Sequence, residues 1–228
     1  GDEELGISPI FTAEDLADRE FRKTASVMKL VIDGPENPNG IASSFAGAGT
    51  ITMGGYDYHT GDRATGEVRD LRAGRCMGAV LEYAARKQRP VMMYVYSDGS
   101  VFSNGMTDDS EQGRGKGVWT GDNQQTASAF FLVYNPNGQP VLRGTADEQP
   151  VNQQIGFMRP SGDVETSSSP AANNVSSLVE TVVLNYLRLH SADAPLSSVF
   201  EDRAGGVPGH GLGDVDRQNS ITAFNPII

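Results

Sequence analysis

The pattern of apolar and polar positions predicts three amphipathic helices. Apolar residues recur at the spacing of one helix face in three long stretches of the chain. Thr12 is expected to cap the first helix and Pro90 to stop the second, while Ser177 and Glu180 match a capping box in the third. The predicted helices span residues 12–32, 66–88 and 173–190.

Two of these helices are expected to bury one apolar side each. The predicted face of the second helix holds Val68, Leu71, Val80, Leu81 and Ala84. That of the third holds Val175, Leu178, Val179, Val182, Tyr186 and Leu189.

Short apolar runs between the helices predict strands at residues 48–55, 91–96 and 126–134. The order strand, helix, strand from residue 48 to 96 predicts a βαβ unit with a parallel strand pair. Residues 135–138, "NPNG", predict a turn, after which "QPVLRG" is expected to return as the hairpin partner of the preceding strand.

These elements predict an α/β fold with a mostly parallel sheet flanked by helices. The glycine- and aspartate-rich stretch 97–125 is expected to form one long loop. A single domain is expected over residues 1–200, followed by a glycine-rich extended tail at 201–228.

Composition and charge narrow the classes of function. The net charge of −11 repels phosphate backbones and anionic lipid, so we expect no nucleic-acid partner. One cysteine excludes a disulfide within the chain, and no apolar run is long enough for a transmembrane segment. The first ten residues are acidic and do not form a signal peptide.

Acidic and imidazole groups follow two of the predicted strands. Asp57 and His59 come after the first strand of the βαβ unit, and Asp98 comes after the second. The carboxyl ends of adjacent parallel strands meet, so these side chains are candidate ligands of one divalent metal. Zn, Mn or Fe suits a site with the imidazole, and Mg or Ca suits one with oxygens alone. The alternative is a pair of polar turns with no bound metal.

A second candidate site contains two cations in "GRGKGVW". Arg114 and Lys116 offer an anion-binding pair, although the segment does not match a phosphate-binding loop. The alternative is a loop in which the two cations offset the neighbouring acids Asp108, Asp109 and Glu111.

The order of these pieces resembles that of a bacterial group of exported proteins related to sulfatases and alkaline phosphatases. The resemblance rests on "GGYDYHTG", a helix, "MMYVYSDGS", a glycine-rich loop with a tryptophan, and an apolar strand followed by "YNPNG". It implies an alkaline-phosphatase-like fold and a periplasmic, cell-surface or extracellular location. It also implies that Asp57 and His59 are metal ligands, and that Ser97, Asp98 and Gly99 match a Ser-acid element of the group.

The chain departs from this group in two ways. Trp119 and Asp122 fall where the group has a tryptophan and an Asp-His pair, but the histidine is absent. No nucleophile motif is present either, and the matched portion of the fold begins in mid-domain. We therefore expect a carboxyl-terminal portion of a larger fold. Its partner would be the amino-terminal portion of the same precursor or another protein chain, and a homo-oligomer is a further option.

Three functions remain open at this stage. The first is an exported protein with a degenerate or single-metal site, little or no hydrolase activity and a structural or assembly role. The second is a metal-dependent phosphate- or sulfate-ester hydrolase, in which Arg114 or Lys116 steadies the anion. The third is a surface protein that binds sugars or polymers through exposed Tyr56, Tyr58 and Trp119.

Overall fold

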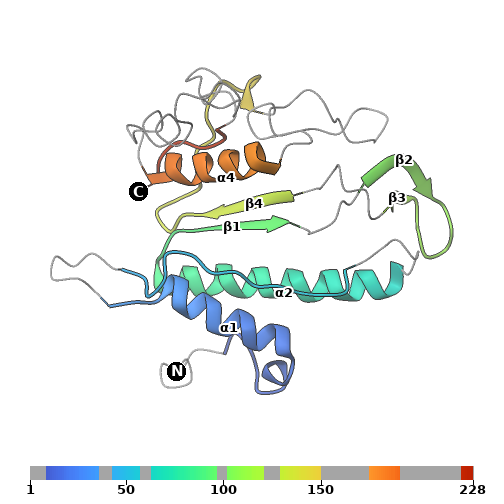
Figure 1. Cartoon of the computed structure of the whole chain (residues 1–228), viewed down its shortest axis with the longest axis horizontal. Helices are drawn as coiled ribbons and strands as arrows, with labels where there is room; N and C mark the ends of the chain where they lie inside the picture. Colours follow the sequence, from blue (N-terminus) through green and yellow to red (C-terminus); the bar gives the residue numbers. More distant parts are fainter. Residues whose placement is uncertain are drawn as a thin grey trace. The chain divides into compact units, whose positions relative to one another are not determined.

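A computed structural model of the chain shows a mixed α/β protein built of two compact units (Figure 1). The first unit comprises residues 1–91 and 133–138, and the second comprises residues 92–132 and 139–228. The structure describes residues 9–35, 43–56, 63–96, 102–120, 129–149, 175–190 and 222–227.

The described helices and strands confirm the mixed α/β class. The helices are α1 (Arg19–Ile32), α2 (Arg63–Lys87) and α4 (Val175–His190), with a 3-10 turn, η2 (Asp15–Ala17), ahead of α1. The strands are β1 (Val91–Tyr96), β2 (Phe102–Asp108), β3 (Lys116–Thr120) and β4 (Ala129–Tyr134).

The helix predicted over residues 12–32 is interrupted at Asp18. This residue is extended, with ψ of 133°, and its carboxylate accepts a hydrogen bond of 2.7 Å from the backbone N–H of Glu20. Aspartate favours such a capping position over a helix interior, so α1 starts one residue later. Thr12 caps only the short turn before it, where its hydroxyl accepts from the N–H of Asp15 at 3.0 Å.

Helices α1 and α2 pack side by side and form the core of the first unit (Figure 1). The buried face of α1 repeats at helical spacing, as does that of α2, so both helices are amphipathic as predicted. Val68 and Leu71, however, are 63% and 67% exposed, so the buried face of α2 is confined to its second half. The buried residues are Phe21, Thr24, Met28 and Ile32 in α1, and Cys76, Ala79, Val80, Tyr83 and Ala84 in α2.

Helix α2 ends in a Schellman motif without a glycine. The N–H of Arg89 donates to the carbonyl of Ala84 at 2.9 Å, and the N–H of Gln88 donates to Ala85 at 3.1 Å. Gln88 adopts the left-handed conformation, with φ of 53°, in the position that glycine usually takes. Pro90 follows and prevents the helix from continuing, as the sequence predicts.

The segment 48–55 does not form the predicted strand, so no βαβ unit joins it to β1. It runs as an extended chain with helix partners instead of strand partners. The ammonium of Lys23 donates to the carbonyl of Thr52 at 2.8 Å, and a β-carbon placed on Gly49 would stand 2.6 Å from a methyl carbon of Val27. The glycine thus allows close packing on α1, which favours this path over a sheet ladder.

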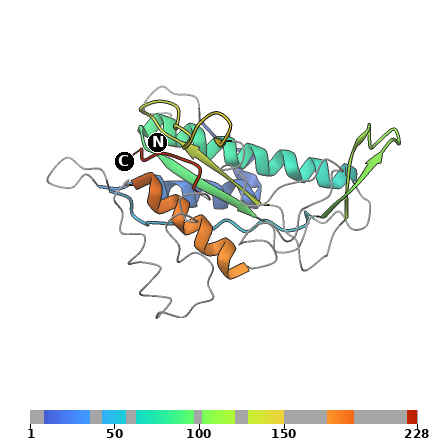
Figure 2. The same ribbon diagram turned by 90° about the horizontal axis from the view of Figure 1, so that it is seen from above.

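Two two-stranded sheets are present in the described part of the chain, β1 with β4 and β2 with β3. The arrows of β1 and β4 point in opposite directions in Figures 1 and 2. Strands β2 and β3 are antiparallel and form a hairpin within residues 97–125, where a single long loop was predicted. A mostly parallel sheet is therefore not seen among the described strands.

The last described residues, 222–227, pack against α4 and the segment after β4. Leu142 bridges Phe224 in an isolated antiparallel pair, and the N–H of Arg143 donates to the carbonyl of Ala223 at 2.8 Å. The predicted hairpin between "QPVLRG" and β4 is therefore wrong, because residues 141–143 pair with a segment near the end of the sequence. The turn at 135–138 is confirmed by the 3.4 Å hydrogen bond from the N–H of Gly138 to the carbonyl of Asn135.

Helix α4 buries a more polar face than predicted. Thr181, Leu184, Asn185 and Leu189 are buried, whereas Val179 and Tyr186 are 54% and 44% exposed. Asn185 bonds both its own helix and the segment at Ala223, so a polar residue occupies the buried side at no cost in unpaired groups.

Candidate functional site

The described part of the candidate metal segment ends at Tyr56, and contacts with α1 and α2 hold it in place. The phenol of Tyr56 lies 3.4 Å from the sulfur of Met53. Burial raises the pKa of this phenol, against the opposing effect of the nearby Arg72 guanidinium. Tyr56 is therefore half-buried against α2, which does not suit the fully exposed stacking role expected in the sugar-binding hypothesis.

The guanidinium of Arg69 lies against the backbone of Gly55. A β-carbon placed on Gly55 would stand 2.5 Å from one terminal guanidinium nitrogen of Arg69 and 2.6 Å from its central carbon. Gly55 also has φ of 84°, which only glycine adopts readily. Two independent constraints therefore favour glycine at this corner.

Three arginines of α2 point to the amino-terminal half of the first unit, and two of them have carboxylate partners. Arg75 lies 2.7 Å from Asp15 and also stacks over the ring of Phe21, 4.6 Å from its centroid. Arg72 lies 3.3 Å from Asp18. Arg69 is half-buried, and no ion pair or hydrogen bond links its side chain to the described part of the chain.

The three predicted metal ligands, Asp57, His59 and Asp98, lie outside the described residues. Within the ranges that the structure describes, no three His, Cys, Asp or Glu side chains gather closely enough to hold a metal ion. The prediction of a divalent metal at Asp57, His59 and Asp98 therefore stays a prediction.

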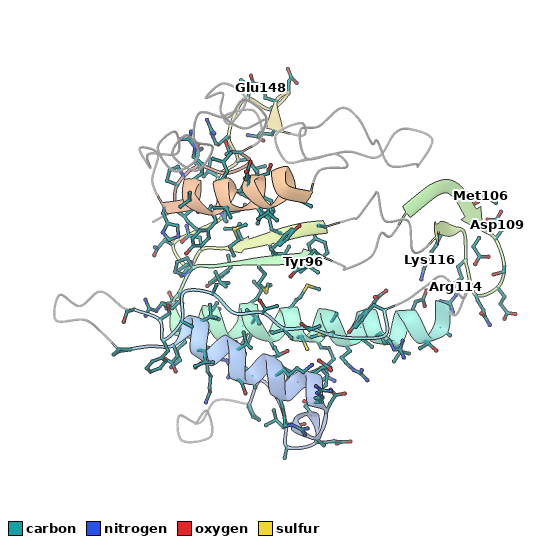
Figure 3. All side chains as sticks on the ribbon, in the orientation of Figure 1. Tyr96, Met106, Asp109, Arg114, Lys116 and Glu148 are labelled. Atoms are coloured by element: carbon teal, nitrogen blue, oxygen red, sulfur yellow. The ribbon has the colours of Figure 1, made fainter. Side chains whose placement is uncertain are left out.

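The two cations of the predicted anion site lie at the end of the β2–β3 hairpin (Figure 3). Lys116 faces Asp108 in the register of the hairpin, and both Arg114 and Lys116 are exposed. The loop between the strands is closed by hydrogen bonds from Gly115 N–H to the carbonyl of Asp108 at 2.9 Å and from Ser110 N–H to its carboxylate at 3.0 Å.

Gly113 and Arg114 show how tightly this loop folds. Gly113 is buried, and a β-carbon there would overlap the side chain and carbonyl of Asp108. Arg114 has φ of 52°, a left-handed conformation. The segment is an ordered hairpin turn with acids next to its cations, which matches the alternative of internal charge compensation more closely than an open anion site.

Trp119 lies in β3, where its backbone pairs with Ser103, and its side chain is outside the described part. Asp122 is also outside the described residues. A pair of tyrosines that the sequence analysis did not single out lies in β1. The rings of Tyr94 and Tyr96 stack with centroids 5.0 Å apart, and Tyr96 is 59% exposed. Their i, i+2 spacing in a strand was the available signal.

Cys76 is a core residue rather than a nucleophile. It is 3% exposed, and burial raises the pKa of its thiol more than the hydrogen bond with Thr24 lowers it. A thiol that stays protonated inside a helix pair has low reactivity.

A shallow groove of about 310 Å³ lies between the segment at Pro9–Phe11 and α2. Its charged lining residues are already engaged: Arg75 pairs with Asp15, and Arg86 lies 2.7 Å from Glu82. The groove therefore offers little unsatisfied chemistry to a ligand.

The chain matches no protein-family model, and no curated protein or solved structure matches it either. Among the described helices, none is both long and apolar enough to cross a membrane.

Proposed function

We propose that this chain is an exported protein of alkaline-phosphatase or sulfatase type with a structural or assembly role and little or no hydrolase activity. The observation that supports an assembly role is the composition of the β1–β4 pair. Every residue of β1, "VMMYVY", and of β4, "AFFLVY", is apolar or aromatic, on both faces of both strands.

Strands of this kind are typical of the middle of a sheet that is covered on both faces. Here β1 and β4 pair only with one another in the described part of the chain. Phe130 and Leu132, on one face of β4, are 48% and 36% exposed. Neither strand carries the lysine or proline with which soluble proteins protect free edges.

The proposed assembly completes this sheet with strands from another polypeptide. The added strands belong to the amino-terminal portion of the same precursor or to a separate protein chain. The completed sheet is then mostly parallel, with an antiparallel strand among parallel ones, as is common in large sheets. The acidic net charge of −11 opposes pairing with a second copy of this chain.

Hydrogen exchange followed by mass spectrometry tests the assembly role on native material and on the isolated chain. The amides of β1 and β4 should exchange at least tenfold more slowly in the native assembly than in the isolated chain. Leu132→Lys should abolish that difference, whereas Val141→Lys, at a site 61% exposed and outside the strands, should preserve it. Equal exchange of both strands in native and isolated protein would contradict the assembly role.

A metal-dependent ester hydrolase is the second candidate. The observation in its favour is the firm placement of Thr52, Gly55 and Tyr56, which lead into the predicted ligands Asp57 and His59. Asp57, His59 and Asp98 would hold the ion, which would polarise the ester oxygen when bound.

Metal analysis and hydrolysis of 4-nitrophenyl phosphate and 4-nitrophenyl sulfate separate the two candidates. Under the assembly proposal, the wild-type chain and its Asp57→Ala and His59→Ala variants hydrolyse both esters at the same background rate. Turnover that depends on a stoichiometric metal and is lost in both variants would establish the hydrolase instead.

A further inference from the structure

We propose that Arg69 forms a binding site for a tetrahedral oxyanion, phosphate or sulfate, at the corner made by Gly54 and Gly55. This inference goes beyond the assembly role and does not depend on a bound metal. It starts from the contrast among the arginines of α2. Arg72 and Arg75 each hold an aspartate, whereas the guanidinium of Arg69 lies on the backbone of Gly55.

The state of Arg69 is unfavourable without an anion. Its side chain is half-buried, and one side of the guanidinium is covered by the Gly55 backbone. A guanidinium carries five N–H donors, and removing it from water costs free energy unless acceptors replace that water. No such acceptor is bonded to Arg69 in the described part of the chain, so an external anion is the group that would satisfy it.

The space beside this guanidinium is open. A β-carbon placed on Gly54 would meet no atom within 4 Å, and both Gly54 and Gly55 are exposed. A side chain at either position would narrow the approach to Arg69. The two glycines therefore leave room for a ligand the size of a phosphate group.

The charge around the corner adds to the attraction. Lys23 reaches the carbonyl of Thr52 at 2.8 Å, and Arg72 lies near enough to the Tyr56 phenol to influence its pKa. Glu20 and Asp18 offset Lys23 and Arg72, respectively, which leaves Arg69 as the cation whose charge is not matched by a described ion pair. A guanidinium in this setting suits the paired oxygens of a phosphate or sulfate.

The test is isothermal titration calorimetry on the metal-free chain with inorganic phosphate, inorganic sulfate and phenyl phosphate. The wild type should bind at least one of these anions, and Arg69→Ala should weaken that binding by roughly 10- to 100-fold. Arg69→Lys should retain part of it, because it keeps the charge and loses the fork of donors. Arg86→Ala is the matched control on the same helix, since Arg86 already pairs with Glu82.

The three anions distinguish the source of the ligand. Tighter binding of phenyl phosphate than of inorganic phosphate assigns the site to monoesters, and the reverse assigns it to the free ion. Far-UV circular dichroism checks that each variant folds. The inference is overturned if the wild type binds none of the anions, or if Arg69→Ala and Arg86→Ala bind equally well. It is also overturned if only Asp57→Ala binds them, because Arg69 would then serve an internal carboxylate.

Discussion

The side-chain oxygen of Asn185 accepts a hydrogen bond of 3.0 Å from the backbone N–H of Ala223, and both residues are buried. The amide nitrogen of the same side chain donates to the carbonyl of Thr181 at 2.9 Å. One asparagine thus joins α4 to a segment 38 residues further along the chain.

Replacing Asn185 should loosen this junction. Asn185→Ala leaves the buried N–H of Ala223 without its acceptor, which should lower the free energy of unfolding of the second unit by about 1–3 kcal/mol. Urea unfolding and the exchange rate of the Ala223 amide measure the effect. Asn225→Ala is the control, because Asn225 is exposed and its 3.5 Å bond to Leu142 is long. Equal losses in the two variants would contradict the special role of Asn185.

Gly55 should tolerate substitution far less well than its neighbour. Gly55→Ala combines a left-handed φ with a collision against Arg69, so we expect a loss of about 1–2 kcal/mol or more. Gly54→Ala meets no atom and should change stability by less than about 0.5 kcal/mol. Thermal unfolding of the two variants checks the difference. The double variant Gly55→Ala, Arg69→Ala should recover only the part of the loss that is due to the collision.

The hydroxyl of Tyr83 donates to the carboxylate of Asp33 at 3.0 Å, and Lys87 lies 3.3 Å from the other oxygen. Burial acts to raise the pKa of Asp33, but the bonds from Tyr83 and Lys87 outweigh it, so the net pKa is lowered. Tyr83→Phe should therefore cost roughly 1 kcal/mol at neutral pH. It should also raise the pKa of Asp33, which NMR titration measures.

The pH dependence of this contact follows from the lowered pKa. The stabilisation is complete above the unfolded-state pKa of aspartate, about 4, and is lost as the pH falls through the lower folded-state value. The stability difference between wild type and Tyr83→Phe should therefore shrink below about pH 4. Tyr134→Phe is the control, since its hydroxyl makes no hydrogen bond with the described part of the chain. A difference that is constant from pH 7 to pH 2 would show that the lost bond does not involve the ionised carboxylate.

Gln88 offers a stabilising substitution. It holds the left-handed position of the Schellman motif with φ of 53°, so Gln88→Gly should raise the unfolding temperature by about 2 °C, or about 0.5–1 kcal/mol. Gln88→Ala keeps the strained backbone and loses the 2.8 Å bond from the Gln88 side chain to the carbonyl of Ala85. Calorimetry should thus place the glycine variant above the wild type and the alanine variant at or below it. A lower unfolding temperature for the glycine variant would contradict this account.

The elements with strong local signals were predictable from the sequence. The strand at 91–96 agrees with β1 at both ends, and the helices predicted at 66–88 and 173–190 correspond to α2 and α4 within a few residues. In each case a long periodic pattern or an uninterrupted apolar run coincides with a clear stop, such as Pro90.

The misses concern segments whose partners lie far away in the sequence. Residues 48–55 have a β-branched centre, but Lys23 and Val27 of α1 supply their contacts in place of a strand. Residues 141–143 pair with residues near 224, a contact that local turn chemistry does not reveal. The β2–β3 hairpin was missed because its polar, glycine-rich turn outweighed the β-forming residues on either side.

The candidate site was predicted only in part. Arg114 and Lys116 lie on one hairpin as their spacing suggests, yet the acid that faces Lys116 is Asp108, which the register alone determines. Arg69 was missed because a single arginine in a helix gives no sequence signal. Its relevance comes from its contact with Gly55, across a gap of 14 residues in the sequence.

The burial of Cys76 gives the protein an intrinsic label. It is the only thiol in the chain, and Thr24 of α1 covers it from the neighbouring helix. A maleimide or a disulfide reagent can react there only while α1 and α2 are transiently separated. The alkylation rate of unmodified protein therefore measures how often the first unit opens, and no engineered dye or tag is needed to follow it.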